Sequence, residues 1–223
     1  MKTRINTVSI SVTNKCNFYC KHCSVDAGVE LCNKLEFKEI IELLKNLKKF
    51  YVKKIELTGG EPLLRKDLIK IIKFAKKLNY KTKVLTNGSL LSKNKIISLK
   101  KAGLDEIAIS LDGADFLKYK KLRPVSREIF FRVLRNIKHA SSSGIFIKIN
   151  TVLIRSNLNS LQKIINFCEK YKIKEMRICY FTKKGRGKNL NEVVDSKIWL
   201  KFLKKLKTHN INLYAGFSYA NFH

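Results

Sequence analysis

The feature that most constrains the fold is the alternation of short strand-like runs with amphipathic helical runs along most of the chain. Strands are predicted over residues 7–13, 54–57, 81–85, 106–111, 145–154 and 175–181, with a short final strand over 211–214 as a further candidate. Helices are predicted over residues 35–50, 67–78, 92–103, 128–142, 158–171 and 196–208. Such alternation predicts an α/β fold whose parallel strands are joined by right-handed crossovers.

Six clear repeats are too few for a complete eight-stranded barrel, so two architectures stay open. One is a partial (β/α)6 TIM-like barrel, and the other is an open doubly wound sheet. Both place ligands at the carboxyl ends of the parallel strands. With 223 residues, 45% of them hydrophobic, the chain can bury one large core. We therefore expect one domain over residues 1–210 and a tail over residues 211–223.

Three cysteines, Cys16, Cys20 and Cys23, stand within eight residues directly after the first predicted strand. Iron–sulfur clusters are normally held by four cysteines, so a loop of three can ligate three irons and leave the fourth open to another ligand. A zinc site is the alternative, but structural zinc usually has two short ligand pairs, and His22 sits awkwardly beside Cys23 for a shared metal. A chance group of buried thiols is the remaining interpretation.

A second motif, Thr58-Gly59-Gly60-Glu61-Pro62, follows the second predicted strand. The two glycines allow positive φ and close approach of the backbone to a ligand, and Glu61 offers a carboxylate that can bind an ammonium group. Pro62 restrains the preceding residue to extended geometry and so fixes the direction of that carboxylate. Taken alone, the motif is more typical of a tight turn with a surface glutamate.

Together the two motifs resemble those of the radical SAM superfamily, and the resemblance extends over about residues 7–187. It implies a six-repeat partial TIM barrel in which the three cysteines bind a [4Fe–4S] cluster. It also implies that Gly59, Gly60 and Glu61 position S-adenosylmethionine (SAM). One electron from the reduced cluster would cleave SAM to a 5′-deoxyadenosyl radical, which abstracts hydrogen from a substrate. An electron donor such as flavodoxin or ferredoxin is implied as a partner.

Polar residues that follow later strands are further candidates for contacts with SAM. Asn87 follows the third predicted strand and Asp112 the fourth, where either an ordinary turn or a ligand contact accounts for each of them. In the resemblance to radical SAM enzymes, Ser110 and Asn150 match positions whose side chains contact the ribose or the carboxylate of SAM. Arg177, on the sixth predicted strand, either neutralises a carboxylate or forms an ion pair inside the barrel.

The stretches at residues 56–63, 85–88 and 109–113 resemble one branch of the superfamily, which includes peptide-modifying maturases and the molybdenum-cofactor cyclase. The implied substrate is a peptide or protein side chain, or a small biosynthetic intermediate. Many maturases of this branch add a Cys-rich extension that holds further clusters, and Gly185-Arg186-Gly187 resembles the segment leading into it. The chain stops before such a region, so we expect an enzyme that lacks the extension or a truncated product, which can be an inactive remnant.

The three remaining cysteines are too scattered to form a second cluster. Cys168 is expected in the core because it lies on a predicted helix beside Phe167. Cys179 is expected either in the core or facing the active-site cavity. Cys32 follows the cysteine motif and is either a surface thiol or a substrate contact.

The formal net charge of +30 arises from 38 Lys and 9 Arg against 17 acidic residues. The lysines are spread over every predicted helix without an aromatic-interleaved basic stripe, so compositional drift accounts for the charge better than a nucleic-acid site does. An Fe–S or zinc-bearing module that binds nucleic acid is the non-enzyme alternative. The sequence shows neither an apolar run of membrane-spanning length nor a signal-peptide region, and reduced thiols suit metal binding. We therefore expect a cytoplasmic protein without a membrane partner.

Overall fold

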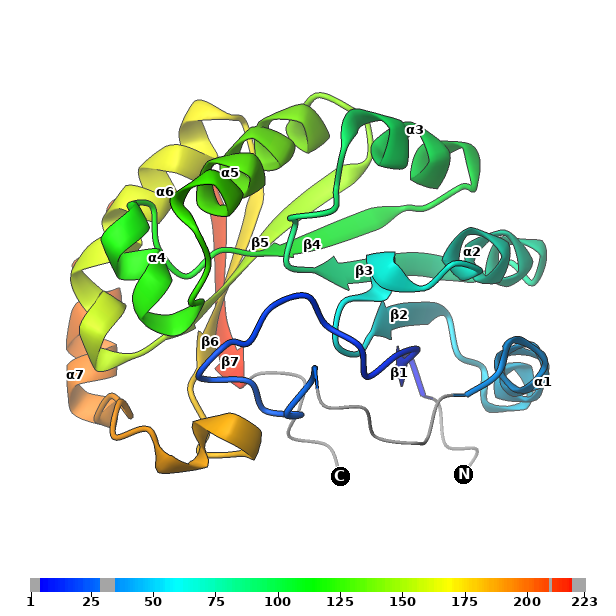
Figure 1. Ribbon diagram of the computed structural model, residues 1–223, viewed down its shortest axis with the longest axis horizontal. Helices are drawn as coiled ribbons and strands as arrows, with labels where there is room; N and C mark the ends of the chain where they lie inside the picture. The colour runs from blue at the N-terminus through cyan, green and yellow to red at the C-terminus, as the bar shows by residue number, and fades with distance from the viewer. Residues whose placement is uncertain (1–4, 29–34, 209, 218–223) are drawn as a thin grey trace.

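A computed structural model describes residues 5–28, 35–208 and 210–217 and shows a curved sheet of seven parallel strands in chain order (Figure 1). The strands are β1 (Thr7–Ser11), β2 (Lys54–Thr58), β3 (Lys81–Thr86), β4 (Glu106–Ser110), β5 (Phe146–Leu153), β6 (Glu175–Tyr180) and β7 (Asn212–Phe217). The predicted partial TIM-like barrel is confirmed, because the strand order does not reverse as it would in a doubly wound sheet. The last strand, a candidate over residues 211–214, extends to Phe217 and adds a seventh strand to the six expected.

In the described part of the chain, seven α-helices lie between successive strands. They are α1 (Phe37–Leu47), α2 (Leu68–Lys77), α3 (Lys93–Lys101), α4 (Phe116–Leu122), α5 (Arg127–Ser141), α6 (Leu161–Lys170) and α7 (Ser196–Leu203). Two of them, α4 and α5, lie between β4 and β5. Helix α4 has no counterpart among the predicted helices, because seven residues with three lysines show little amphipathic period. Its first turn is held by Asp115, whose side chain accepts from the backbone N–H of Lys118. None of the described helices has the length and apolar character needed to cross a membrane.

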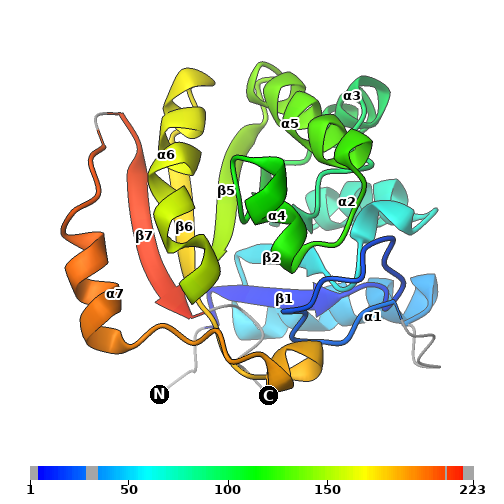
Figure 2. The ribbon, with the colours of Figure 1, turned by 60° about the vertical axis from the view of Figure 1, so that its left-hand side comes forward.

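The helices cover the outer face of the curved sheet, and the hydrophobic core lies between the two layers (Figure 2). Strand β5 shows the alternation that separates the faces, since Ile147, Ile149 and Leu153 are buried on the outer side. Lys148 and Asn150 share the inner face and are only half-buried. Strand pairing in the described sheet stops at β1 and β7, so the sheet forms a half-barrel with an open inner face.

Toward the amino ends of the strands, the inner face is lined by ion pairs. Lys83 on β3 lies 3.0 Å from Glu56 on β2, and both side chains are 3% exposed. Lys148 on β5 bridges Glu106 on β4, at 3.5 Å, and Glu175 on β6, at 2.6 Å. These charges pair with one another across neighbouring strands, and the Lys83–Glu56 pair is buried. The alternating apolar residues of the strands therefore identify only the outer face. The inner face near the amino ends of the strands consists of paired opposite charges.

Helix α3 begins at the residue that its sequence predicts. Ser92 is the N-cap, and its hydroxyl accepts from the backbone N–H of Lys95 at 3.2 Å. The replacement Ser92→Ala should lower the free energy of unfolding by about 1 kcal/mol, because one N–H at the start of the helix loses its acceptor. Urea denaturation measures this loss. Ser98→Ala in the exposed middle of the same helix is the control, and an equal loss in both variants would contradict the capping role.

Candidate functional site

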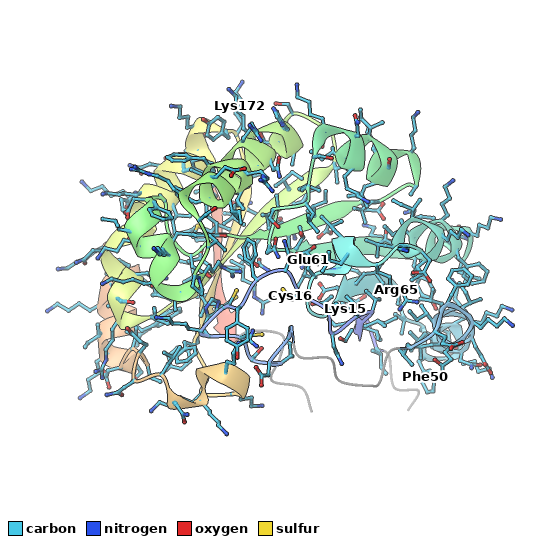
Figure 3. All side chains as sticks on the ribbon, viewed as in Figure 1. Lys15, Cys16, Phe50, Glu61, Arg65 and Lys172 are labelled. Atoms are coloured by element: carbon cyan, nitrogen blue, oxygen red, sulfur yellow. The ribbon has the colours of Figure 1, made fainter. Side chains whose placement is uncertain are left out.

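The carboxyl ends of β1 and β2 bring the two predicted motifs to one rim of the half-barrel. Strand β1 leads into residues 12–28, which carry the three cysteines and are called the Cys loop, and β2 leads into the turn at residues 59–62, called the GGEP turn. Cys16 and Glu61 lie close together in Figure 3, and the backbone N–H of Glu61 donates to the carbonyl of Lys15 at 2.8 Å. The structure therefore places the two motifs in direct contact.

The glycines of the GGEP turn make this contact possible. The N–H of Gly60 donates to the carbonyl of Thr13 at 2.7 Å. A Cβ on Gly59, whose φ is +133°, would lie 2.2 Å from that carbonyl oxygen, and a Cβ on Gly60 would lie 2.3 Å from the carbonyl oxygen of Lys15. Only glycine fits at both positions. The close approach that these glycines allow is thus to the backbone that enters the Cys loop.

Glu61 is fully buried, and its carboxylate is enclosed by donors from the protein. It accepts from the hydroxyl of Thr86 at 2.8 Å, from the N–H of Asn87 at 2.7 Å and from the N–H of Leu63 at 3.1 Å. Burial raises the pKa of Glu61, although the three hydrogen bonds oppose that rise. The carboxylate thus fastens the GGEP turn to the carboxyl end of β3. A direct contact between this carboxylate and an ammonium group stays a prediction.

Each thiol of the Cys loop accepts one N–H donor. Cys16 accepts from the backbone of Phe18 at 3.4 Å, and Cys23 accepts from the backbone of Ala27 at 3.3 Å. The Sγ atom of Cys20 lies 3.5 Å from Nη1 of Arg123. N–H donors of this kind stabilise a thiolate, which is the form that binds metal. The donor set therefore fits a group held by three separate thiolates.

The electrostatic environment of the cysteines is dominated by burial. Burial raises the pKa of Cys16 and raises that of Cys20 to about 11. At Cys20 the Arg123 guanidinium opposes this effect on the pKa more strongly than the Asp112 carboxylate adds to it. Among the described residues, no three His, Cys, Asp or Glu side chains converge closely enough to hold one metal ion. In a cubane cluster each thiolate binds its own iron, so that convergence is not required.

Asp112 forms the centre of a buried polar group behind Cys20. Its Oδ2 lies 2.6 Å from Nε of Arg123 and 3.3 Å from Nε2 of His22, and its Oδ1 accepts from the N–H of Val152 at 2.8 Å. Burial alone would raise the pKa of Asp112, but Arg123 and His22 outweigh it and hold that pKa well below its usual range. The structure thus gives Asp112 three protein partners and no exposed surface. Its predicted contact with SAM is untested.

A second arginine, from the C-terminal part of the chain, also contacts the Cys loop. Arg186 lies in the 3₁₀ turn Gly185–Asn189, which follows β6. Its Nε donates to the carbonyl of Cys20 at 3.0 Å, its Nη1 lies 2.6 Å from Asp26, and its guanidinium stacks 3.9 Å from the ring centre of Tyr19. A Cβ on Gly185 would lie 2.5 Å from the carbonyl oxygen of Cys23, so this turn packs tightly on the loop.

Three buried polar atoms have no hydrogen-bond partner among the described residues, and all belong to side chains around the Cys loop. They are Nδ1 of His22, the hydroxyl of Tyr119 and Nη2 of Arg186. Tyr119 belongs to this group because its ring lies 6.0 Å from the Arg123 guanidinium. Buried polar atoms normally have partners, so unpaired ones clustered at one place fit a site built to receive a further polar group.

The remaining predicted SAM contacts fall into two places. Asn87 lies on the rim, where its amide donates to Asn17 in the Cys loop at 2.9 Å and its carbonyl accepts from Ser89. Ser110 and Asn150 are register partners on β4 and β5 and share the inner face below the rim. Asn150 also lines a cavity of about 450 Å³ on the inner face. The other residues that line it are Lys83, Lys148, Glu175, Met176, Arg177, Tyr214 and Ala215.

The other described cysteines lie apart from this rim or within the sheet. Cys168 on α6 is fully buried in the core, as predicted, and burial raises its pKa to about 12. Cys179 on β6 is 4% exposed, and burial raises its pKa to about 11. Cys32 and residues 218–223 of the predicted tail lie outside the described residues.

Sequence reasoning did not connect either Arg123 or Arg186 with Cys20. Arg123 lies 103 residues from it in the chain and Arg186 lies 166 residues from it. One signal was available, because the chain has only 9 Arg among its 47 basic residues. Arginine presents several N–H donors in a rigid plane, so a lysine-rich chain that retains a few arginines indicates positions where that geometry is used.

Comparison with known proteins adds independent findings. The family model of the radical SAM superfamily matches residues 10–168. A relative from Methanosarcina mazei named "Probable GTP 3',8-cyclase" is 34% identical over 177 residues, covering 76% of this chain and 52% of the relative. A GTP 3',8-cyclase from Campylobacter fetus is 34% identical over 202 residues, covering 86% of this chain and 62% of the relative. The chain thus spans between half and two thirds of the length of these relatives.

Solved structures share the fold. The crystal structure of Streptococcus suis SuiB bound to S-adenosylmethionine superposes with a TM-score of 0.82 at 19% identity, covering 98% of this chain and 52% of that one. SuiB bound to its precursor peptide SuiA gives a TM-score of 0.81 at 18% identity, covering 99% of this chain and 50% of that one. Native anSMEcpe with bound AdoMet superposes with a TM-score of 0.70 at 17% identity, covering 90% of this chain and 58% of that one.

Proposed function

This chain belongs to the radical SAM superfamily, whose enzymes use a [4Fe–4S] cluster and SAM, and on that premise we propose that the rim described above binds both cofactors. When bound, they supply the reductive cleavage of SAM to methionine and a 5′-deoxyadenosyl radical that takes a hydrogen atom from the substrate. The observation that carries the proposal is the Cys loop itself. Each of its three thiols has one N–H donor, and the loop is bonded to the GGEP turn at Thr13 and Lys15.

The residues of the rim divide into ligands and supports. Cys16, Cys20 and Cys23 would each ligate one iron and leave the fourth iron to SAM. The backbone carbonyl oxygens of Gly59 and Gly60 would accept from the amino group of SAM, since the N–H of Gly60 already donates to Thr13. These two glycines lie against the Cys loop, whereas the carboxylate of Glu61 is turned toward β3.

The polar residues of neighbouring strand ends would complete the SAM site. Ser110 and Asn150 would contact the ribose or the carboxylate, since both lie on the inner face just below the rim. Asn87 and Asp112 both contact the Cys loop, at Asn17 and His22 respectively. They would therefore set the position of the site, whether or not they also touch SAM.

The substrate would lie in the inner cavity below the rim. A small anionic intermediate suits it because the relatives named GTP 3',8-cyclase act on a nucleotide. This is the substrate class we favour. The cavity wall carries three cations and Glu175, and two of the cations, Lys83 and Lys148, are paired with carboxylates of the sheet. A peptide is the second candidate, since the inner face is open between β1 and β7 and the similar SuiB structure holds a precursor peptide.

The cluster would be reduced by an electron donor such as flavodoxin or ferredoxin. A formal charge of +30 would speed encounter with an acidic partner of this kind. Thiol ligands are maintained in reducing compartments, which supports our proposal of a cytoplasmic location.

The test is anaerobic reconstitution with iron and sulfide, reduction with dithionite in the presence of SAM, and chromatography for 5′-deoxyadenosine. The wild type should form it, and the variant in which Cys16, Cys20 and Cys23 are all replaced by Ala should form none. Cys168→Ala is the matched control, because that thiol lies in the core and should be dispensable for the product. A fully loaded, reducible wild type that leaves SAM intact would overturn the proposal. Salt-sensitive binding to nucleic acid would then favour a binding module.

If SAM is cleaved, the substrate classes can be separated by the same assay. GTP as a small anionic substrate should raise the yield of 5′-deoxyadenosine above its substrate-free level and yield a new nucleotide product by mass spectrometry. Lys148→Gln, which removes one cation from the cavity wall, should weaken that stimulation. Stimulation by peptides but not by nucleotides would contradict the small anionic substrate.

A further inference from the structure

The two arginines that hold Cys20 act on different atoms of that residue. Arg186 binds its backbone carbonyl, whereas Arg123 approaches its sulfur, with Nη1 at 3.5 Å from Sγ. Resting on the proposed cluster, we infer that Arg123 is a positioning residue that donates to the Cys20 thiolate and makes the cluster easier to reduce. Arg186, in contrast, sets only the path of the loop.

The burial of Arg123 makes its charge effective at the sulfur. The residue is 6% exposed, so little water competes for its N–H groups or screens its charge. Reduction adds a negative charge beside the sulfur ligands, and a cation with an N–H donor at that place stabilises the added charge. Hydrogen bonds to sulfur and local net charge are the levers by which proteins set cluster potentials.

Asp112 fixes the direction in which Arg123 points. Its Oδ2 takes the Nε side of the guanidinium at 2.6 Å, which leaves the Nη1 side for Cys20. The carboxylate is itself anchored by the N–H of Val152 on β5. Because Asp112 is negative, it opposes the effect of Arg123 on the cluster. The two residues should therefore shift the potential in opposite directions when each is neutralised.

Because the two potential shifts should have opposite signs, they can be distinguished from the effects of a merely structural role. Arg123→Gln, Arg123→Lys and Asp112→Asn are reconstituted anaerobically without SAM, their iron and sulfide contents are measured, and the midpoint potential is determined by EPR-monitored titration. Arg123→Gln should move the potential to more negative values, and Arg123→Lys should move it less. Asp112→Asn, whose amide oxygen can still accept from Arg123, should move it to more positive values.

Two controls separate the sulfur contact from general damage. Arg186→Gln loosens the same loop without removing a donor to Sγ, and the charge of Arg186 is paired with Asp26, so it should lower cluster content and move the potential of the loaded fraction less than Arg123→Gln does. Arg132→Gln removes an exposed arginine paired with Glu128 on α5 and should change neither quantity. Equal potentials in wild type, Arg123→Gln and Asp112→Asn at matched iron content would overturn the inference. So would shifts of the same sign in both variants.

Failure of this inference can be distinguished from failure of the proposed function. If the wild type assembles a cluster and cleaves SAM while the potentials do not differ, only the role of Arg123 is overturned. A wild type that assembles no cluster overturns both. If Arg123→Gln does not fold, the expected positive shift in Asp112→Asn and the smaller negative shift in Arg123→Lys still decide the inference.

Discussion

The replacement Gly59→Ala should strongly destabilise the protein and reduce the iron that it incorporates. The new Cβ would lie 2.2 Å from the carbonyl oxygen of Thr13, and φ at this position is +133°. Overpacking costs about 1–3 kcal/mol and left-handed backbone strain about 1–2 kcal/mol, so the free energy of unfolding should fall by about 2–5 kcal/mol. Relief of the clash must move the backbone that enters the Cys loop, which is why iron content should fall too.

Urea denaturation of the metal-free protein and iron analysis after reconstitution measure the two effects. Gly103→Ala is the matched control, because Gly103 also has a positive φ, of +86°, but a Cβ there would meet only the flexible side chain of Lys76. It should lose only the strain energy, about 1–2 kcal/mol, and keep its iron. If both variants lose the same stability and both keep full iron content, the contact between the GGEP turn and the Cys loop does not limit cluster binding.

The replacement Asp112→Ala should have an effect of similar size for a different reason. It leaves Arg123 buried without its carboxylate, and breaking a buried ion pair in this way costs about 3–5 kcal/mol. The loss should appear as a lower urea midpoint with an unchanged slope. Glu128→Ala is the matched control, because Glu128 and Arg132 are separated by the same 2.6 Å but lie on the surface of α5. Exposed pairs contribute about 0.2–1 kcal/mol.

The stability of the wild type should also depend on pH through Asp112. The folded pKa of Asp112 lies well below the unfolded value of about 3.9. The stabilisation is therefore fully present above that unfolded value and is lost progressively as the pH falls toward the folded pKa. In Asp112→Ala this part of the acid dependence should be missing. An acid-unfolding profile identical to that of the wild type would contradict the role of the buried pair.

The fold was largely predictable because the outer face of each strand and the inner face of each helix carry the apolar periodicity. The strands at 54–57 and 81–85 were placed within one residue of β2 and β3. Helix α4 was not predictable in this way, because its seven residues contain three lysines. The ion pairs of the inner face were not predictable either. Their partners lie on neighbouring strands, and the sequence of a single strand does not show which residues pair.

The candidate site was predictable where its residues are close in the sequence, as in the Cys loop and the GGEP turn. The hydrogen bonds between Glu61 and residues 86–87 were not, because a carboxylate after two glycines indicates a surface side chain or a ligand contact, whereas Glu61 is buried and bonded within the protein. The contacts of Arg123 and Arg186 with Cys20 were not predicted, for a topological reason. Each arginine reaches Cys20 only after the curved sheet brings distant strand ends to one rim.

That the sheet is wound in chain order has a consequence for biosynthesis. Most contacts between strands join neighbours in the chain, so each β–α unit can dock on the one before it as the polypeptide emerges from the ribosome. The Cys loop is the exception, because it is synthesised first, whereas Arg186 in the turn Gly185–Asn189 is synthesised 166 residues after Cys20. Iron delivered to a nascent chain would therefore meet a Cys loop that still lacks the contacts of Arg186 with Cys20 and Asp26. Stable loading of the cofactor should follow completion of the sixth strand and its downstream turn, which makes cluster insertion a late step in maturation.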